Sequence, residues 1–190
     1  AIIDFNGKNV LLVCAVDRFG MAEALAEQNC RLLFGDIIYG LGCNIPIRSL
    51  AALRRWASVL VPIITRLPIK WMYPTGKKQD SHISRHPEYF ADSDVIAGDF
   101  LFIKRFMPAR LSGKTIITNT VTAADRQMLQ DAGVKTLITT TPCLQGRSFG
   151  TNVLEAAIVA ASGSKKALQP EEYEVFIRKY KIMPSIEHFQ

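Results

Sequence analysis

The stretch from residue 9 to residue 36 constrains the fold of this chain more than any other. Residues 10–13 form a short apolar run of the kind that buried parallel strands contain. Residues 15–19 are expected to form a turn, and residues 21–28 are rich in good helix formers. A second strand follows, and Asp36 ends it with a carboxylate. A strand, a turn, a helix, a strand and an acid in this order predict the first half of a dinucleotide-binding unit.

The turn and the acid are the expected cofactor contacts. In a dinucleotide-binding unit, the amides at the helix start face the pyrophosphate and the acid bonds the ribose hydroxyls. The fingerprint G-x-G-x-x-G is reduced to CAVDRFG at residues 14–20, so most of its glycines are missing. The residues expected to contact the cofactor are Ala15, Val16, Asp17, Arg18, Phe19, Gly20 and Asp36.

Three of these residues have alternative roles. Asp36 is either a ribose ligand, which the spacing favours, or a carboxylate that caps the following turn. As a ribose ligand it would select NAD over NADP by repelling the 2′-phosphate. Arg18 either clamps a phosphate or is a solvated turn residue. Gly20 is expected to be structural, permitting close packing or an unusual dihedral angle at the helix start.

The composition is that of a globular domain. The chain has 190 residues, of which 48% are hydrophobic and 21% charged. These values suit one well-buried domain over residues 1–190 and argue against disorder. The longest apolar segment, near residues 59–64, is too short to span a bilayer. We recognise no signal peptide where the sequence begins.

Charge and cysteine content narrow the expected partners. The net charge of +6 suggests an anionic partner. No basic stripe is interleaved with aromatic residues, so nucleic acid is disfavoured. The four cysteines lack metal-type spacing, and Cys14 and Cys30 lie in apolar sequence, which indicates reduced thiols in a cytoplasmic protein. His82 and His86 share a loop without a third ligand at zinc spacing, so no metal site is expected.

The rest of the chain alternates predicted helices and strands. Capping or breaking residues mark the helix boundaries: Ser49 and Pro62 for the first helix, Thr122, Asp125 and Gly133 for the second, Thr151 for the third and Pro170 for the last. The further strands are expected at residues 69–73, 94–98, 115–119 and 134–140. This alternation predicts an α/β fold, a Rossmann-like three-layer αβα sandwich with a parallel sheet of five or six strands.

The topology also predicts where a ligand would bind. If residues 69–73 count, the strand order is 3-2-1-4-5-6, and ligands of such sheets bind at the switch point, beyond the carboxyl ends of the first and fourth strands. The residues expected there, in addition to the turn, are Gly98, Asp99, Asn119, Thr120, Thr140 and Thr141.

Three residues near this edge are candidates for chemistry. Asp99 is either a general base or a cap for the segment that follows. Arg147 lies in a glycine-flanked loop before a helix, where it either holds a substrate carboxylate or is an exposed loop charge. Cys143 has no histidine nearby in the sequence, which disfavours a role as nucleophile.

The polar segment over residues 74–87 has two interpretations. It is rich in turn-forming residues and is therefore expected to be an exposed loop. The first interpretation is a solvated connector. The second is a lid that carries Lys77, Lys78 and Arg85 over an anionic ligand.

Five segments of the chain resemble one family. They are GKNVLLVCAVDRFGMAEALAE, GDIIYGLGCNIPIRSL, DVIAGDFLFIKRFMP, TIITNTVTAAD, and TLITTTP with LQGRSFGTNVLEA. Together they cover nearly the whole chain and are similar to proteins labelled quinate or shikimate 5-dehydrogenase-like. The resemblance implies an NAD(P)-dependent oxidoreductase that acts on a cyclic polyhydroxy acid.

The resemblance also implies a longer protein. Full-length members carry an N-terminal domain before a segment like AIIDFNGK, so this chain would be the C-terminal nucleotide-binding half. True shikimate dehydrogenases place a catalytic lysine and aspartate in that N-terminal domain, so we expect the isolated chain to be inactive. They also carry a substrate-binding glutamine on the helix after the last strand, where this chain offers Asn152 and Glu155.

Two classes of function remain open. The first is the nucleotide-binding domain of a dehydrogenase whose substrate domain is not in this chain. The second is a non-catalytic or differently catalytic nucleotide-binding module, which the loss of the glycines would tolerate. For the first class the expected partners are a dinucleotide and an anionic small substrate. No membrane partner is expected, and a homodimer is possible.

Overall fold

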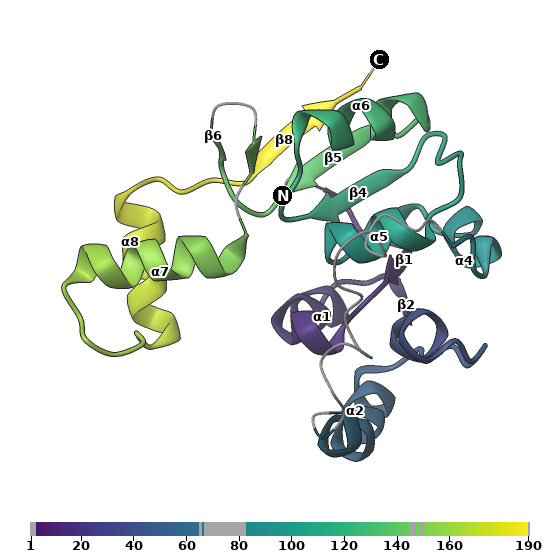
Figure 1. The fold of residues 1–190 in the computed structure, drawn as a ribbon, viewed down its shortest axis with the longest axis horizontal. Coiled ribbons are helices and arrows are strands. Elements are labelled where there is room, and N and C mark those ends of the chain that lie inside the picture. The colour runs from purple at the N-terminus through teal and green to yellow at the C-terminus, as the bar shows by residue number, and fades with distance from the viewer. Residues whose placement is uncertain (1–2, 65, 67–82, 145–146, 149, 190) are drawn as a thin grey trace.

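The computed structural model describes residues 3–64, 66, 83–144, 147–148 and 150–189 (Figure 1). The first part contains β1 (Asn9–Leu12), the 3-10 turn η1 (Val16–Arg18), α1 (Phe19–Ala26), β2 (Arg31–Phe34), the π-helical segment η2 (Asp36–Leu41) and α2 (Leu50–Ile64). The middle part contains α4 (Pro87–Ala91), β3 (Val95–Ala97), α5 (Phe100–Phe106), β4 (Thr115–Thr118), α6 (Ala123–Asp131) and β5 (Thr136–Thr139). The last part contains the hairpin strands β6 (Cys143–Leu144) and β7 (Arg147–Ser148), then α7 (Thr151–Ser162), α8 (Pro170–Lys179) and β8 (Ser185–His188).

The main sheet has the strand order β2-β1-β3-β4-β5-β8. The strands from β2 to β5 are parallel to one another, and β8 pairs with β5 in the antiparallel direction. This arrangement confirms the predicted Rossmann-like α/β fold with five parallel strands. Residues 69–73, which were expected to form an edge strand, lie outside the described residues.

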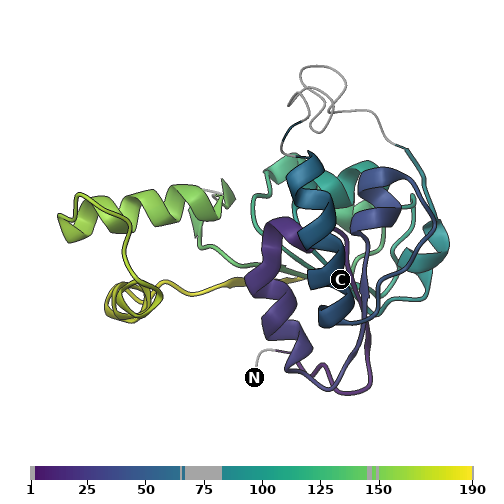
Figure 2. The ribbon, with the colours of Figure 1, turned by 90° about the horizontal axis from the view of Figure 1, so that it is seen from below.

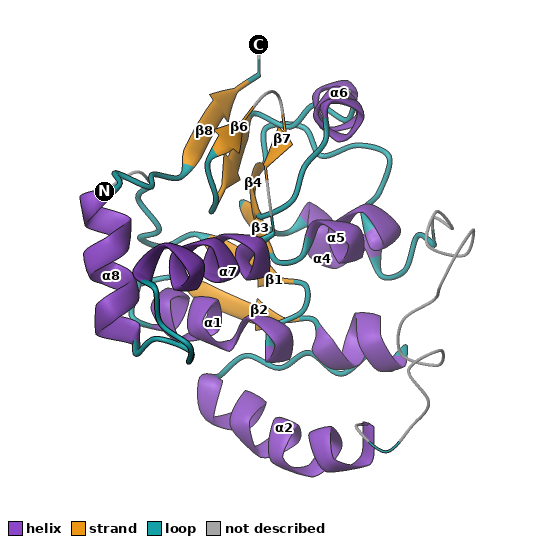
Figure 3. Cartoon of the chain, turned by 60° about the vertical axis from the view of Figure 1, so that its left-hand side comes forward, coloured by secondary structure: helices purple, strands orange, loops and turns teal. Residues whose placement is uncertain are grey.

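The strands β1 and β3 at the centre of the sheet are buried on both faces. Along β1, Leu11 belongs to the core that contains residues of α4, α5 and α6, whereas Val10 and Leu12 belong to the core that contains residues of α1 and α2. Helices therefore cover both sides of the strands, as Figure 3 shows. The continuous apolar run of β1 follows from this burial, because neither face of the strand meets water.

Two helical segments were not predicted. In α5, the sequence FLFIKRF begins with four apolar residues in succession, a pattern that is ambiguous between strand and helix. The helix forms because the Asp99 carboxylate accepts a hydrogen bond from the Leu101 amide and because Phe100, Ile103 and Phe106 are buried together. The segment η2 directly follows β2, where no helix was expected.

The predicted boundaries of the other helices are close to those observed. Thr122 and Asp125 form the expected capping box of α6, and Gly133 follows that helix with φ +83°. At α7 the prediction was wrong by one residue, because Gly150 is the N-cap and Thr151 is the first helical residue. Pro170 begins α8 as expected. Pro62 lies inside α2, close to its end at Ile64.

The helices α7 and α8 project away from the sheet and cross each other, and together we call them the arm (Figures 1 and 2). In α7 only Ile158 is buried, and in α8 no residue is. The chain returns from α8 to the sheet through β8, which the sequence analysis missed. With only four residues, Ser-Ile-Glu-His, β8 is too short for its alternation to be distinctive.

Candidate functional site

The turn after β1 lies at the carboxyl edge of the sheet, as predicted. Cys14 and Ala15 are buried there, η1 follows, and α1 begins at Phe19. Gly20 was expected to permit close packing or an unusual dihedral angle, and the structure requires neither. Its φ is not positive, and an added Cβ would meet no atom within 4 Å. The turn therefore replaces the missing glycines with a buried alanine and a tight 3-10 turn.

Asp36 is folded onto this turn. Its Oδ1 accepts hydrogen bonds from the amides of Ala15 and Val16, both at 2.9 Å. Its Oδ2 is buried and has no hydrogen-bond partner among the described residues. Burial raises the pKa of Asp36 to about 6, against the lowering effect of the amide hydrogen bonds. The carboxylate thus joins the end of β2 to the turn before α1, and it does not cap the turn that follows it.

Cys14 lies beside this carboxylate. Burial raises the pKa of the Cys14 thiol well above its ordinary value, and the nearby charges of Asp36 and Asp17 add to the effect. The thiol is therefore neutral, and it donates weakly to Asp17 Oδ2 at 3.6 Å. A neutral buried thiol in this position is a packing residue, because the thiolate is the reactive form.

Arg18 joins the turn after β1 to the loop after β3. One guanidinium nitrogen donates to Asp99 Oδ2 at 2.9 Å, and another donates to Thr151 Oγ1 at 3.2 Å. The side chain of Arg18 is only 19% exposed, so it is not a solvated turn residue. Its Nε is buried without a hydrogen-bond partner in the part of the chain that the structure describes. Asp99 has two roles, since Oδ1 caps α5 while Oδ2 pairs with Arg18.

Gly98 allows β3 to end close to β1. Its φ is +137°, which side-chain-bearing residues rarely adopt, and an added Cβ would lie 3.5 Å from the Val13 nitrogen. Thr118 Oγ1 donates to the Gly98 carbonyl at 2.8 Å, which holds the end of β3 against the end of β4. The backbone at the ends of β1, β3 and β4 is therefore closely spaced at this edge.

The ends of β4 and β5 contribute the remaining predicted residues. Asn119 is buried, and its carbonyl accepts a hydrogen bond from Ser148 Oγ, which in turn accepts from the Val121 amide at 2.8 Å. Thr120 lies beside Gly150 at the start of α7. The Thr140 amide donates to the Thr118 carbonyl at 2.8 Å, and the Thr141 carbonyl accepts from Thr139 Oγ1 at 3.0 Å. These residues line the same edge as the turn, as predicted.

The residues proposed for substrate binding lie around the start of the arm. Asn152 is exposed in the first turn of α7, next to Thr151. Arg147 lies in β7, paired with Leu144 of β6. Cys143, on the same hairpin, accepts a hydrogen bond from the Arg126 guanidinium at 2.9 Å. Among the described residues no group of three or more His, Cys, Asp or Glu side chains is placed to hold a metal ion.

The lid interpretation concerns Lys77, Lys78 and Arg85, of which the structure describes Arg85. Lys77 and Lys78 lie outside the described residues. The Arg85 guanidinium lies over the Phe106 ring, 5.7 Å from its centroid. Phe106 ends α5, whereas Asp99 caps its beginning, so Arg85 contacts the end of the helix that is away from Asp99.

A cavity of about 570 Å³ lies at the opposite, amino edge of the sheet. Its lining includes Lys8, Lys114, Lys135 and His188, together with Asp4 and Asp94. None of the candidate site residues that the sequence predicted lines this cavity. In open parallel sheets, ligands bind at the carboxyl edge, so we place the candidate site there and not in this cavity.

Two residues of the site were missed by sequence reasoning. Thr151 was expected only as a helix cap, yet its hydroxyl accepts from Arg18. Ser148, which ties the β6–β7 hairpin to the end of β4, was not singled out at all. A serine in a glycine-flanked loop carries no distinctive signal, because its partners are 27 and 29 residues away in the sequence.

Fold and site together define a Rossmann-like α/β domain whose carboxyl edge is built around an arginine–aspartate pair. Residues 1–189 match the family described as a domain of unknown function (DUF8754), and the chain belongs to this family. No curated protein and no solved structure matches the chain. No helix in the described ranges combines the length and apolar character needed to cross a membrane.

Proposed function

We propose that the chain binds a dinucleotide at its carboxyl edge, NAD in preference to NADP, as the nucleotide-binding part of an oxidoreductase. The oxidoreductase class, and a cyclic polyhydroxy acid as the anionic substrate, rest on the sequence resemblance to quinate or shikimate 5-dehydrogenase-like proteins. The four cysteines are free thiols, which is compatible with a cytoplasmic enzyme. A homodimer is part of the same proposal.

The observation that carries the proposal is a pair of buried polar atoms on the two sides of the turn. Arg18 Nε is a donor without an acceptor, and Asp36 Oδ2 is an acceptor without a donor, among the described residues. Buried polar groups are almost always hydrogen-bonded, so these two atoms at one turn are groups that a bound ligand could satisfy. A phosphate oxygen would accept from Arg18 Nε, and a ribose hydroxyl would donate to Asp36 Oδ2.

The order of these atoms along the edge fits the shape of a dinucleotide. The ribose of such a cofactor lies at the end of the second strand, and its pyrophosphate lies at the start of the first helix. Asp36 follows β2, and Arg18 directly precedes α1. Both atoms are covered in the free chain, so binding requires the turn to shift and Arg18 to loosen its bond to Asp99. The bound cofactor would supply hydride transfer.

The second candidate is a nucleotide-binding module with no redox chemistry or a different chemistry. One observation favours it: Asp36 Oδ1 already takes the amides of Ala15 and Val16, the groups that a glycine-rich loop would offer to a pyrophosphate. In this case the ligand would be a mononucleotide or a nucleoside-based cofactor whose single phosphate or charged group is held by Arg18.

Calorimetric titration of the purified chain with NAD, NADP, ATP and S-adenosylmethionine separates the two candidates. The proposal predicts that NAD binds most tightly and that quinate and shikimate do not reduce it in the presence of the isolated chain. Tighter binding of ATP or S-adenosylmethionine would favour the second candidate. Absence of binding for all four would contradict both.

A further inference from the structure

The helix α8 carries a stripe of charges on its exposed side that is ordered by sign. Glu171, Glu172, Val175, Arg178 and Lys179 are spaced by three and four residues, so they share one face of the helix. All five residues are exposed, and Val175 at the centre is 62% exposed. We call these five residues the α8 stripe. Its two acidic residues lie at the beginning of the helix, its valine at the centre and its two basic residues at the end.

The arm that carries the stripe leaves much of its apolar surface exposed to solvent. The sequence of α7, TNVLEAAIVAAS, contains one charged residue, yet only Ile158 is buried. A helix with so wide an apolar face is expected to pack that face against another surface. Figures 1 and 2 show the arm beside the sheet and not against it. The large apolar residues exposed on the arm and the segment after it are Val153, Val175, Ile177, Tyr180 and Met183.

We propose that the α8 stripe pairs with the same stripe of a second copy of this chain. In a two-fold pairing the two helices run antiparallel, and residues at equal distances from the centre meet. With Val175 on the axis, Glu171 meets Lys179 of the second copy and Glu172 meets Arg178 of the second copy. Each of these contacts occurs twice, and the two valines meet at the centre.

The sign order of the stripe selects this partner over others. The stripe carries two acids and two bases, so a uniformly acidic or basic partner would meet like charges at one of its ends. Only a surface with the opposite order satisfies both ends, and an antiparallel copy provides it. Acids at the start and bases at the end also favour the isolated helix through its dipole, and the experiment below distinguishes the two effects.

The charged side chains on the stripe that have contacts in the free chain make them at the exposed surface. Glu172 Oε2 accepts a hydrogen bond from the Gln169 amide at 2.7 Å, within the capping box that begins α8. Arg178 pairs with Glu174 in the free chain, but both side chains remain more than half exposed, at 81% and 64%. Lys179 lies over the rings of Phe176 and Tyr180. Exposed pairs of this kind contribute little, so exchange for contacts with a second copy is feasible. One helix pair makes a small interface, below about 1,200 Å², so the dimer should be reversible and weakened by salt.

Charge exchange tests the proposal, with association measured by sedimentation equilibrium. Glu171→Lys and Lys179→Glu each place like charges together in a homodimer, so each variant should dimerise about tenfold or more weakly than the unmodified chain. An equimolar mixture of the two variants should form a heterodimer, because each basic face then meets an acidic one. The double variant in one chain should regain the homodimer.

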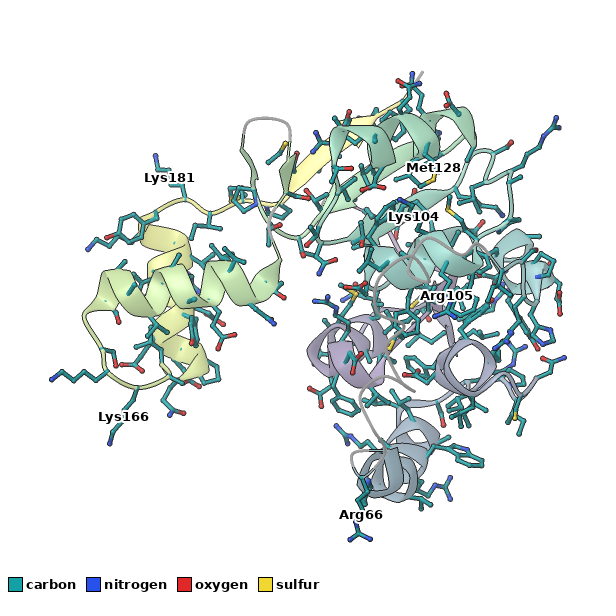
Figure 4. All side chains as sticks on the ribbon, in the orientation of Figure 1. Arg66, Lys104, Arg105, Met128, Lys166 and Lys181 are labelled. Carbon is teal, nitrogen blue, oxygen red and sulfur yellow. The ribbon has the colours of Figure 1, made fainter. Side chains whose placement is uncertain are left out.

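The double variant separates the interface from the helix dipole. If the single changes act only by weakening α8, the double change should be the worst of the three. Circular dichroism monitors the helix in each variant. Lys166→Glu, in the loop before α8 at the outer end of the arm (Figure 4), is the matched control and should leave association unchanged. A chain that is monomeric at every concentration, or a double variant that does not recover, would overturn the proposal.

Discussion

The guanidinium of Arg18 donates to the Asp99 carboxylate across 2.9 Å, which joins the turn after β1 to the residue that caps α5. The two residues are 81 positions apart in the sequence. Because α5 follows β3 directly, the ion pair spans the switch point of the sheet, where the crossover direction changes. The arginine therefore lies at the place where our proposal puts a phosphate of the ligand.

Replacing Arg18 by alanine should weaken nucleotide binding about tenfold or more, because a charged hydrogen bond contributes about 1.5–3 kcal/mol. The matched control is Arg54→Ala. Arg54 also pairs with a carboxylate, Glu23 at 2.7 Å, but its side chain is 59% exposed, and exposed pairs contribute little. Calorimetry on both variants measures the difference. Equal affinities for the two variants would show that Arg18 does not contact the ligand.

The protonation of Asp36 should make the free energy of unfolding depend on pH. Its pKa is about 6 in the folded chain, against an ordinary value of 3.8. The folded state therefore binds more protons than the unfolded state between these values, and its stability falls as pH rises through them. A difference of this size corresponds to about 3 kcal/mol at most.

Asp36→Asn removes this titration and keeps an oxygen that can accept from the turn amides. Denaturant unfolding of both chains at a series of pH values isolates the effect of residue 36, since all other groups are shared. The stability of the unmodified chain minus that of the variant should decrease between about pH 4 and about pH 6 and then level off. A difference that stays constant with pH would contradict the raised pKa.

Gly35 and Gly20 should respond in opposite ways to alanine. A Cβ at Gly35 would lie 2.5 Å from the buried ring of Tyr39 and 2.9 Å from the Val13 carbonyl, so overpacking should cost about 1–3 kcal/mol or more. A Cβ at Gly20 meets nothing within 4 Å and lies in α1. There alanine should stabilise by about 0.5–1 kcal/mol. Thermal unfolding of both variants measures the contrast, and equal shifts would contradict this packing.

The sequence predicts the parallel strands well and the site contacts only in part. The run from Val10 to Val13 is apolar throughout because both faces of β1 are buried, a signal that is local to the strand. The capping box at Thr122 is equally local. The ion pair between Arg18 and Asp99 depends on how the loops after β1 and β3 meet, which no local pattern encodes.

The contacts of Asp36 also could not be predicted from a local sequence pattern. Its position after β2 was predicted from spacing, and the structure places it beside the turn. Oδ1 accepts from the amides of Ala15 and Val16, and Oδ2 has no hydrogen-bond partner among the described residues. These contacts depend on how the turn after β1 folds beside the end of β2, and spacing alone cannot predict this.

The most direct test of a dinucleotide at this edge compares NAD and NADP on the unmodified chain and on Asp36→Ser. The Asp36 carboxylate at the ribose would repel a 2′-phosphate, so NAD should bind several-fold to about a hundredfold more tightly than NADP. Serine removes the charge and keeps a hydroxyl, so the gap should narrow or reverse. Equal affinities for NAD and NADP in the unmodified chain, with no change in the variant, would show that Asp36 does not contact the ribose.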